Sequence, residues 1–361
     1  MEQGGVERGV VEMNRIIVAE GWRNVVVSAG GRLAEQIEAD SGRHVELDVK
    51  SKNPLTFFMR AARLRRLLAA ERPDVVCVHS RVPAWLFTWA NRSLRLPWIS
   101  FAHGANSVSA YSRVMTYGDL VVTPSRYIAD HLKAAYGLDD AKLRVIPRAI
   151  DRERFDPDRL DAAFVAEKRA EWGLAGRFVV MGLGRITQLK GYDTLIRATA
   201  LAAAEFPNIR TVIVGEAETL RKDVERELHA LVDELGLGER VTFAGNQSKV
   251  AECLSLADVV VSANTRKPEA FGRSMAEALA MGRPVVAAAF GGALDIVEDG
   301  VNGVLVDPSS GAEGFAAAIV RVARSAYGDL RTPALEKFSF ERMAQASLAV
   351  YRELTVKELK R

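Results

Sequence analysis

The sequence predicts an α/β protein built from two doubly wound domains, each a parallel sheet covered by helices on both faces. Short apolar runs such as Val75–Val78 alternate with longer amphipathic segments along almost the whole chain, and parallel strands buried on both faces have this continuous apolar character. The alternation occurs in each half of the sequence, and 361 residues are enough for two domains of ordinary size. We therefore place domains at residues 1–150 and 151–337.

The first half is expected to open with a glycine-rich loop at Gly4-Gly5. Apolar, valine-rich runs then predict strands, and the segments between them have the spacing of amphipathic helices. Ser125 opens one of these helices and is its expected N-cap. The expected elements are helices at 6–20, 32–39, 55–71, 83–93 and 125–136, strands at 25–27, 45–49, 75–78, 98–101 and 120–122, and a closing apolar segment at 143–147.

The second half repeats the alternation. One of its helices is followed by Gly282 and then Pro284, which is the usual pattern of a helix C-terminus. The expected elements are strands at 177–182, 210–215, 240–243, 258–262, 284–288 and 303–306, and helices at 190–205, 218–236, 248–256, 271–281, 292–298, 311–327 and 340–359.

Composition and charge exclude several classes of protein. The first 150 residues hold 21 Lys and Arg against 15 Asp and Glu, whereas the remainder holds 28 against 31, so an acidic partner is expected for the first half. No apolar run reaches the roughly 18 residues of a membrane-spanning helix, and the N-terminus has no signal-peptide pattern. Cys77 and Cys253 have no disulfide or metal spacing. We expect a cytoplasmic protein, free or peripheral on the inner face of the cytoplasmic membrane.

The most informative stretch runs from Lys267 to Pro284 and carries two glutamates eight positions apart, Glu269 and Glu277. Glu277 lies on the helix predicted at 271–281, and Glu269 lies in the loop before it. The first N–H groups of a helix have no partner within the helix and lie at the positive end of its dipole, where they bind anions. The stretch therefore predicts a diphosphate at the helix start, with a carboxylate on either side to accept hydroxyl hydrogen bonds.

This stretch resembles the glutamate–seven–glutamate signature of glycosyltransferase family 4, in the retaining group of GT-B enzymes. Its surroundings agree in order, with Gly182-Leu-Gly184-Arg185-Ile-Thr-Gln-Leu-Lys190-Gly191 upstream and Gly291-Gly292-Ala-Leu-Asp-Ile-Val-Glu-Asp299-Gly300 downstream. The resemblance covers nearly the whole chain. It implies a GT-B fold of two Rossmann-like domains facing a cleft, an N-terminal acceptor domain and a C-terminal nucleotide-sugar domain. Residues 338–361 would form a helix that returns to the N-terminal domain.

The resemblance also implies roles for individual residues. Arg185 and Lys190 would neutralise the donor diphosphate, Glu269 would bind the donor sugar, and Glu277 would bind the ribose. His103, which follows the strand at 98–101, would meet the sugar at the reaction centre, and His79 is a weaker candidate. The catalytic set is His103, Glu269, Arg185 and Lys190, and the donor-binding set is Gly4, Gly5, Gly184, Arg185, Lys190, Glu269, Phe271, Gly272, Arg273, Ser274 and Glu277.

In the family the glycine-rich loop follows a first buried strand. Here only three residues precede Gly4, so the first strand of the N-terminal domain is expected to be missing. The one Asp-x-Asp-like element, Asp156-Pro-Asp158, falls in the link between the domains, and we therefore expect no metal and no other cofactor.

A second theme is a basic, aromatic segment in the first half. Six basic residues and no acidic ones lie between Lys50 and Arg66, interleaved with Phe57, Phe58 and Met59. Such a segment is typical of helices that bind anionic lipid, or alternatively of a solvated helix whose aromatic face is core. The residues assigned to an acceptor or membrane surface are Arg60, Arg63, Arg65, Arg66, Ser80, Arg81 and Arg126.

The sequence thus leads to a retaining, metal-independent hexosyltransferase with a nucleotide-diphosphate sugar as donor. The acceptor implied by the resemblance is a saccharide or lipid-linked envelope molecule such as lipopolysaccharide core. Nucleic acid is not an expected partner, because no recognised nucleic-acid-binding module is present. Two alternatives stay open: a non-catalytic protein that binds sugar nucleotides, and a nucleotide-sugar epimerase on the same fold.

Overall fold

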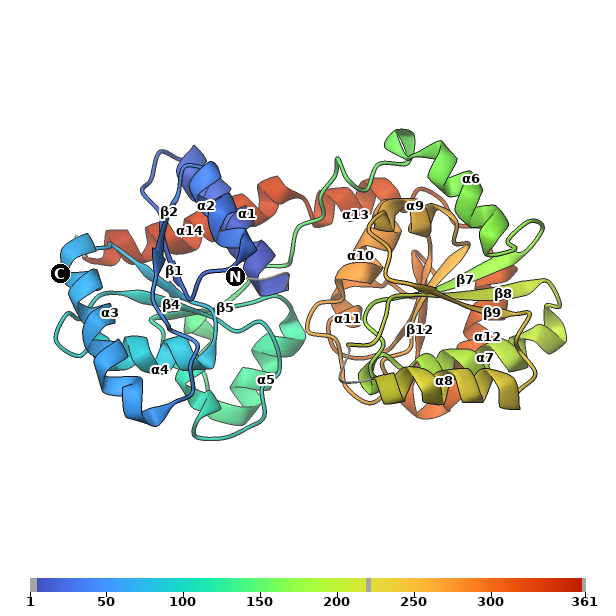
Figure 1. Cartoon of the computed structure of the whole chain (residues 1–361), viewed down its shortest axis with the longest axis horizontal. Helices are drawn as coiled ribbons and strands as arrows, with labels where there is room; N and C mark the ends of the chain where they lie inside the picture. The colour runs from blue at the N-terminus through green and yellow to red at the C-terminus, as the bar shows by residue number, and fades with distance from the viewer. Residues whose placement is uncertain (1–4, 219–221, 359–361) are drawn as a thin grey trace. The chain divides into compact units, whose positions relative to one another are not determined.

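The computed structural model describes residues 5–218 and 222–358 and divides into two compact units. Unit 1 comprises the chain up to Arg148 together with the segment from Glu341 onward, and unit 2 comprises Ala149–Phe340. Both units contain parallel sheets with flanking helices (Figure 1). The predicted fold class, with two parallel-sheet domains, is confirmed.

Unit 1 holds two parallel sheets, one with strand order β1-β2 and one with order β3-β4-β5-β6. Its elements are α1 (Gly5–Ala19), β1 (Val25–Ser28), α2 (Arg32–Ala39), β2 (Arg43–Glu46), α3 (Phe57–Glu71), β3 (Val76–Val78), α4 (Arg81–Ala90), β4 (Trp98–Phe101), β5 (Leu120–Thr123), α5 (Arg126–Tyr136), β6 (Leu143–Val145) and α14 (Phe340–Glu358). Two short 3-10 turns, η1 (Pro54–Thr56) and η2 (Ser112–Thr116), lie before α3 and before β5.

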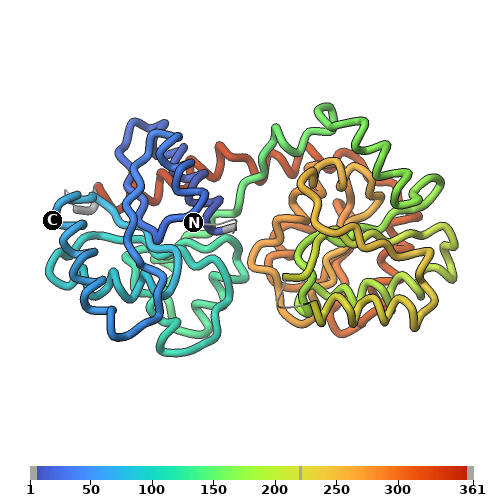
Figure 2. Tube along the Cα trace, in the orientation of Figure 1, coloured from blue at the N-terminus to red at the C-terminus, as the bar shows by residue number. Residues whose placement is uncertain are grey.

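The last helix, α14, packs within unit 1, far in sequence from the rest of that unit. The red C-terminal segment runs among the blue and cyan segments in Figure 2. Arg144 donates to both carboxylate oxygens of Glu353 at 2.8 and 2.7 Å, and the ring of Trp22 contacts that of Tyr351. A bidentate arginine–carboxylate pair fixes orientation as well as distance, so these contacts hold α14 in one place on unit 1.

Unit 2 is built on one six-stranded parallel sheet with the order β12-β11-β10-β7-β8-β9. Its elements are α6 (Ala162–Glu171), β7 (Phe178–Leu183), α7 (Tyr192–Glu205), β8 (Ile209–Val214), α8 (Lys222–Glu234), β9 (Val241–Gly245), α9 (Val250–Ser255), β10 (Val259–Ser262), α10 (Arg273–Ala280), β11 (Val285–Ala288), α11 (Ala293–Ile296), β12 (Gly303–Val306), α12 (Gly311–Ala323) and α13 (Arg331–Lys337).

The strands of unit 2 are buried on both faces. Along β7, Val179 and Met181 belong to one hydrophobic core with Trp172, while Val180 belongs to another with Phe315. Successive strand side chains point to opposite faces, so a continuous apolar run can supply both cores at once. This is the reason that the valine-rich runs predict strands correctly.

Three features of the fold differ from the prediction. Helices α6 and α13 were not anticipated, although Asp161 caps α6 by accepting from the N–H of Phe164 at 3.1 Å, and this acidic cap was a readable signal. The second strand occupies Arg43–Glu46 rather than 45–49. Gly5 is the first residue of helix α1 rather than part of a loop, and Gly4 lies outside the described residues.

The described residues contain no strand ahead of α1, and β1 and β2 form a sheet of their own. No helix in the described ranges is long and apolar enough to cross a membrane.

Candidate functional site

The strand order of unit 2 reverses at one position in its sheet, between β7 and β10. From β7 the chain proceeds outward through β8 and β9, and it then returns to the other side of β7 to continue through β10, β11 and β12. The strands β7 and β10 are neighbours and parallel. Such a reversal leaves a crevice at the carboxyl ends of the two strands, where α/β proteins bind their ligands.

Lys190 and Glu269 meet at this point. Lys190 follows β7 and Glu269 follows β10, and the Lys190 ammonium donates to Oε1 of Glu269. The Nδ2 of Asn264 donates to the same oxygen at 3.1 Å, and Asn264 itself accepts from Ser262 at 3.0 Å. About a quarter of each charged side chain remains exposed (26% and 25%). The pair is therefore oriented by the protein and is still accessible to a ligand.

Gly191 makes this meeting possible. Its φ of +67° lies in the left-handed region, and a Cβ at this position would lie 1.7 Å from the carbonyl oxygen of Ala263. Only glycine has no Cβ to clash there. The turn after β7 can therefore press against the chain leaving β10, and this contact brings Lys190 up to Glu269.

Tyr192 stabilises the same turn through a hydrogen bond. It is almost fully buried, and its hydroxyl donates to the carbonyl of Gly184 at 2.7 Å. Burial, together with the negative charge of Glu269, raises the pKa of Tyr192 above its usual range. The phenol therefore stays protonated and keeps donating, so it holds the segment from Gly184 to Lys190 in a fixed curve.

The helix with the two-glutamate motif is α10. It begins after Gly272, which has a φ of +102°, and ends before Gly282, which has a φ of +69°. The side chain of Phe271 is core, packed edge-on to Phe338 at 5.5 Å. The backbone of Phe271, not its ring, is therefore what this residue can offer a ligand. Arg273 and Ser274, in the first turn, are half-buried, as is Glu277 one turn later.

The loop before α10 is tied to the next motif along the chain. The N–H of Gly292 donates to the carbonyl of Glu269 at 2.8 Å. A Cβ on Gly292 would lie 2.3 Å from the carbonyl oxygen of Phe271. The Gly291-Gly292 motif therefore positions the Glu269 loop by close backbone contact.

Arg185 has a different partner from the one expected. Its guanidinium pairs with Glu218, and both side chains are well exposed, at 74% and 58%. In this structure Arg185 therefore does not join the Lys190–Glu269 pair. A surface pair of this kind contributes little stability, so the arginine can exchange its partner at low cost.

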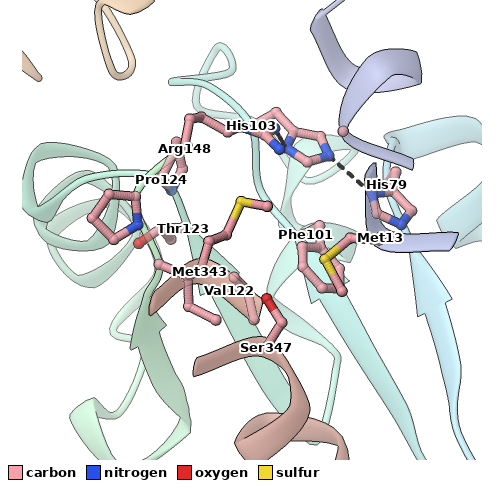
Figure 3. Close-up of a pocket in the computed structure, with 13 residues that line it drawn as sticks. Met13, His79, Phe101, His103, Val122, Thr123, Pro124, Arg148, Met343 and Ser347 are labelled. Carbon is pink, nitrogen blue, oxygen red and sulfur yellow. Dashed lines mark hydrogen bonds between the residues drawn. The ribbon is translucent and has the colours of Figure 1, made fainter. Parts of the chain in front are cut away.

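His103 belongs to unit 1 and forms a chain of hydrogen bonds there (Figure 3). Arg148 contacts its Nδ1 at 2.5 Å, and its Nε2 contacts Nδ1 of His79 at 3.0 Å. Arginine can only donate, so Nδ1 of His103 accepts. The proton of neutral His103 is therefore on Nε2, from which it is donated to His79.

Both histidines are held neutral. Burial, and after it the charge of Arg148, lowers the pKa of His79 to about 3. Burial also holds the pKa of His103 well below its usual value, with further lowering from His79 and Arg148. A guanidinium beside a desolvated imidazole opposes a second positive charge. The hydrogen-bonded group of His79, His103 and Arg148 therefore carries a single positive charge, that of Arg148.

A small cavity of about 30 Å³, enough for a water molecule, lies next to this chain. Its wall includes His79, His103 and Arg148, and α14 contributes Met343 and Ser347 (Figure 3). The returning helix therefore forms part of the surroundings of His103.

Comparison with known proteins is decisive for the family. A model for group 1 glycosyl transferases matches residues 165–332, and a model for Glycosyltransferase Family 4 matches residues 3–154. A D-inositol 3-phosphate glycosyltransferase of Xylanimonas cellulosilytica is 33% identical over 299 residues, which make up 80% of this chain and 69% of that protein. The chain belongs to glycosyltransferase family 4. In a Mycobacterium relative with the same description, the 198 matched residues make up only 43% of its length.

Solved structures agree with this assignment. A glycosyltransferase from Rickettsia africae has a TM-score of 0.87 at 25% identity, with 98% of this chain and 97% of that chain aligned. Anabaena HepE in complex with UDP and glucose has a TM-score of 0.79 at 23% identity, covering 96% and 95%. The lipopolysaccharide outer core galactosyltransferase WaaB has a TM-score of 0.74 at 18% identity, covering 96% of each chain. The last two show the shared fold alone, which is GT-B.

In this glycosyltransferase the residues assigned to an acceptor or membrane surface do not all lie on a surface. Arg60 is 3% exposed and donates to the hydroxyl of Thr56 and to the carbonyls of Asp48 and Asn53 at 3.1 to 3.3 Å. The prediction that Arg60 faces a partner is therefore wrong. Arg60 lies on the buried side of α3, and its hydrogen bonds fix the loop that precedes this helix.

Four other basic residues of that set are exposed. Arg63, Arg65 and Arg66 are exposed on α3, and Arg126 is exposed at the start of α5, where Ser125 caps the helix as predicted. Ser80 is exposed at the start of α4, and Arg81 donates to the hydroxyl of Ser112 at 3.1 Å.

The sequence reasoning missed three residues that position the candidate groups of the two units. Asn264 orients Glu269, Tyr192 supports the turn of Lys190, and Arg148 sets the proton position on His103. Asn264 and Tyr192 follow a strand end and a glycine, which are positions where a signal could have been read. Arg148 gave none, because its partner is 45 positions away in the sequence.

Proposed function

We propose that this enzyme is a retaining, metal-independent hexosyltransferase with a nucleoside-diphosphate sugar as donor. The observation that carries the proposal is the meeting of Lys190 and Glu269 where the strand order of unit 2 reverses, beside the first turn of α10. The donor has a diphosphate and a sugar, and the site offers a group for each. The Lys190 cation and the N-terminus of α10 suit the diphosphate, and the Glu269 carboxylate accepts hydrogen bonds from sugar hydroxyls.

The charge balance favours catalysis as well as binding. Negative charge grows on the diphosphate as the bond to the sugar breaks, so groups that stabilise that charge act more strongly on the transition state than on the bound donor. Lys190 and the α10 amides supply this stabilisation, and Arg185 adds to it by leaving Glu218 for the phosphate. The exposed Arg185–Glu218 pair makes this exchange inexpensive.

The glutamates supply the sugar contacts in the proposal. Glu269 accepts from hydroxyls of the hexose, and Glu277 accepts from the ribose. In the transfer step the bond between the anomeric carbon and the phosphate oxygen breaks, and the acceptor hydroxyl attacks from the same face. Its proton passes to the departing phosphate oxygen, so the configuration is retained and no further base is required.

The structural neighbours support a donor of this class. Anabaena HepE, which shares the fold, is described in complex with UDP and glucose. For the acceptor we propose a saccharide or lipid-linked envelope molecule such as lipopolysaccharide core, with the enzyme peripheral on the cytoplasmic face of the membrane. The likeness to WaaB, a lipopolysaccharide outer core galactosyltransferase, is consistent with this acceptor.

A second acceptor class is favoured by the sequence relatives. The Xylanimonas protein, 33% identical, is described as a D-inositol 3-phosphate glycosyltransferase. We therefore also propose a small phosphorylated cyclitol as acceptor, to be tested beside the envelope glycolipids. The two differ in one practical respect, since transfer to a soluble cyclitol phosphate needs no lipid.

A thermal-shift panel of nucleotide sugars tests the donor. A ligand that binds only the native state raises the melting temperature by mass action. At a ligand concentration one hundred times Kd, the free energy of unfolding rises by about 2.7 kcal/mol. One donor should produce this rise, and Glu277→Ala should abolish it. The matched control is Glu227→Ala, on the exposed face of α8.

Two outcomes would contradict the proposal. If no nucleotide sugar shifts the native protein, the donor assignment fails. If a donor binds but no sugar is transferred to any acceptor, the enzyme is instead a sugar-nucleotide-binding protein, and conversion of the bound sugar without transfer identifies an epimerase.

A further inference from the structure

One face of α4 presents aromatic and basic side chains in a single row. Arg81, Trp85, Trp89 and Arg92 follow one another at spacings of four, four and three residues, which places them on one side of the helix and its C-terminal end. The guanidinium of Arg92 lies 4.2 Å from the centre of the Trp89 ring. The row therefore carries two indoles between two cations.

The start of α3 extends this row on one side. Phe58 packs edge-on to Trp89 with ring centres 4.9 Å apart, and is still 62% exposed. Leu55, three positions before Phe58, is 90% exposed, and the adjacent Met59 is 48% exposed. Helices α3 and α4 contact each other (Figure 1), so these apolar side chains and the α4 row belong to one surface.

The turn η2 extends the row on the other side. Trp85 stacks on Tyr111 and meets Tyr117 edge-on, and its indole N–H donates to the carbonyl of Tyr111 at 3.0 Å. Tyr111 and Tyr117 are 44% and 43% exposed. We use the term aromatic face for Phe58, Trp85, Trp89, Tyr111 and Tyr117 together.

The protein holds this face in place from below. The loop before α3 is fixed by buried Arg60 and by Asn53, whose side chain accepts from the N–H of Leu55 at 2.9 Å. The loop after α4 is closed by Asn91, which exchanges two hydrogen bonds of 2.8 Å with the backbone of Leu96. Side chains on a fixed backbone lose less entropy when they bind a partner. The aromatic face is therefore preorganised for binding.

The charge around the face is predominantly positive. Residues 49–70 and 75–118 contain no Asp or Glu. Of the flanking acids, Glu71 is paired with Arg23 and Arg43, and the exposed Asp48 accepts from the N–H groups of Lys50 and Ser51. Lys50, Lys52, Arg63, Arg65, Arg66, Arg92, Arg95 and Arg113 are exposed basic residues of these stretches. A partner of this surface must therefore combine negative charge with an apolar layer.

We infer that the aromatic face and its basic surround dock the enzyme on a bilayer that contains anionic lipid. Trp and Tyr favour the boundary between headgroups and acyl chains, and basic side chains around them are drawn to the negative surface. Leu55, Phe58 and Met59 would enter the acyl boundary, while Arg63 and Arg66, one and two turns after Met59, would remain among the headgroups. The inference deepens the proposed function, since a lipid-linked acceptor is presented at such a surface.

Vesicle co-sedimentation of the full chain tests the inference. We expect strong binding to vesicles of phosphatidylcholine with phosphatidylglycerol, weak binding to phosphatidylcholine alone, and loss of binding as salt is raised. Each basic group near the surface contributes about fivefold in affinity. Arg63→Glu with Arg66→Glu should therefore weaken binding by about 25-fold or more, and Phe58→Ser with Trp89→Ser by about tenfold per aromatic residue.

Matched controls separate the surface from general charge and exposure. Lys222→Glu with Arg226→Glu makes the same charge change on exposed α8 of unit 2, and Leu201→Ser changes a 45% exposed apolar residue on α7. Neither control should alter vesicle binding. Thermal melting of every variant, with and without the nucleotide sugar, reports folding and donor binding independently of lipid.

Three outcomes would overturn the inference: no binding to anionic vesicles, equal loss in the test and control variants, or binding that the test variants leave unchanged. Quenching of tryptophan fluorescence by a soluble saccharide, without vesicle binding, would show instead that the aromatic face is a sugar platform. Failure of the lipid result with an intact donor shift would leave the proposed transferase standing.

Discussion

The candidate sites of the two units have the same origin in the fold but different electrostatic character. Each lies where the chain leaves parallel strands, with His79 and His103 after β3 and β4, and Lys190 and Glu269 after β7 and β10. In unit 1 the side chains are half-buried, and both histidines are neutral. In unit 2 the pair is charged and a quarter exposed.

The difference shows how desolvation and a neighbouring charge select the chemistry of a strand end. A desolvated imidazole beside an arginine stays neutral, and it then acts through a fixed hydrogen-bond direction. A partly exposed lysine paired with a carboxylate can exchange that carboxylate for a ligand phosphate. The unit 1 site is therefore suited to orientation, and the unit 2 site to charge stabilisation.

The largest expected effect breaks the charged site. In the proposed mechanism Lys190 stabilises the departing diphosphate, so Lys190→Ala should lower kcat by about 10²- to 10³-fold. Lys190→Met, which keeps the length of the side chain, should behave alike, and Lys222→Ala on α8 should not change the rate. A Lys190→Ala enzyme with wild-type kcat on the same donor would show that the unit 2 pair is structural.

A comparison of two glycines tests whether the close contact at Gly191 holds Lys190 in place. Gly191 and Gly236 have nearly the same φ, +67° and +64°, but an added Cβ meets the Ala263 carbonyl at Gly191 and nothing within 4 Å at Gly236. Gly236→Ala should cost about 1 kcal/mol in free energy of unfolding, from the left-handed backbone alone. Gly191→Ala should cost about 3 kcal/mol, since the overlap is added.

Urea unfolding of the two variants measures these costs, and donor binding provides the functional readout. Only Gly191→Ala should also weaken the nucleotide-sugar thermal shift, because only that change moves Lys190. Equal costs at the two positions would mean that the turn of Lys190 relaxes freely and does not hold the pair.

The smallest expected effect concerns the two neutral histidines of unit 1. It is a change in stability that appears only at acidic pH. The folded pKa of His79 is about 3, below its value of about 6.5 in the unfolded chain. Below pH 6.5 the unfolded state binds a proton that the folded state does not, so stability falls as pH is lowered. Above pH 6.5 both states are neutral and the contribution is constant.

Each such histidine adds a slope of up to about 1.4 kcal/mol per pH unit between these limits. His79→Gln keeps an acceptor for His103 and removes one titrating group, so its stability should fall less steeply between pH 6 and 4. Urea unfolding at several pH values measures both slopes. Parallel curves for the variant and the wild type would show that His79 is protonated in the folded state.

Local sequence patterns determined the fold class and most of the unit 2 site. Apolar runs predict strands because side chains alternate between two buried faces, and Gly282 ends α10 because it adopts the left-handed conformation that terminates a helix. The apolar pattern that ends at Gly282 placed Glu277 on a helix and Glu269 in the loop before it, as the structure has them. These features depend on neighbours in sequence, which a linear reading contains.

The tertiary structure alone decided which distant groups meet. Arg60 was expected on a surface because its neighbours are basic, yet packing of α3 on α4 turned it inward, where its guanidinium satisfies loop carbonyls. Arg185 joined Glu218, 33 positions away, and Arg148 reached His103 across 45 positions. Such contacts follow from the order of strands in the sheet, which brings together chain segments that share no local pattern.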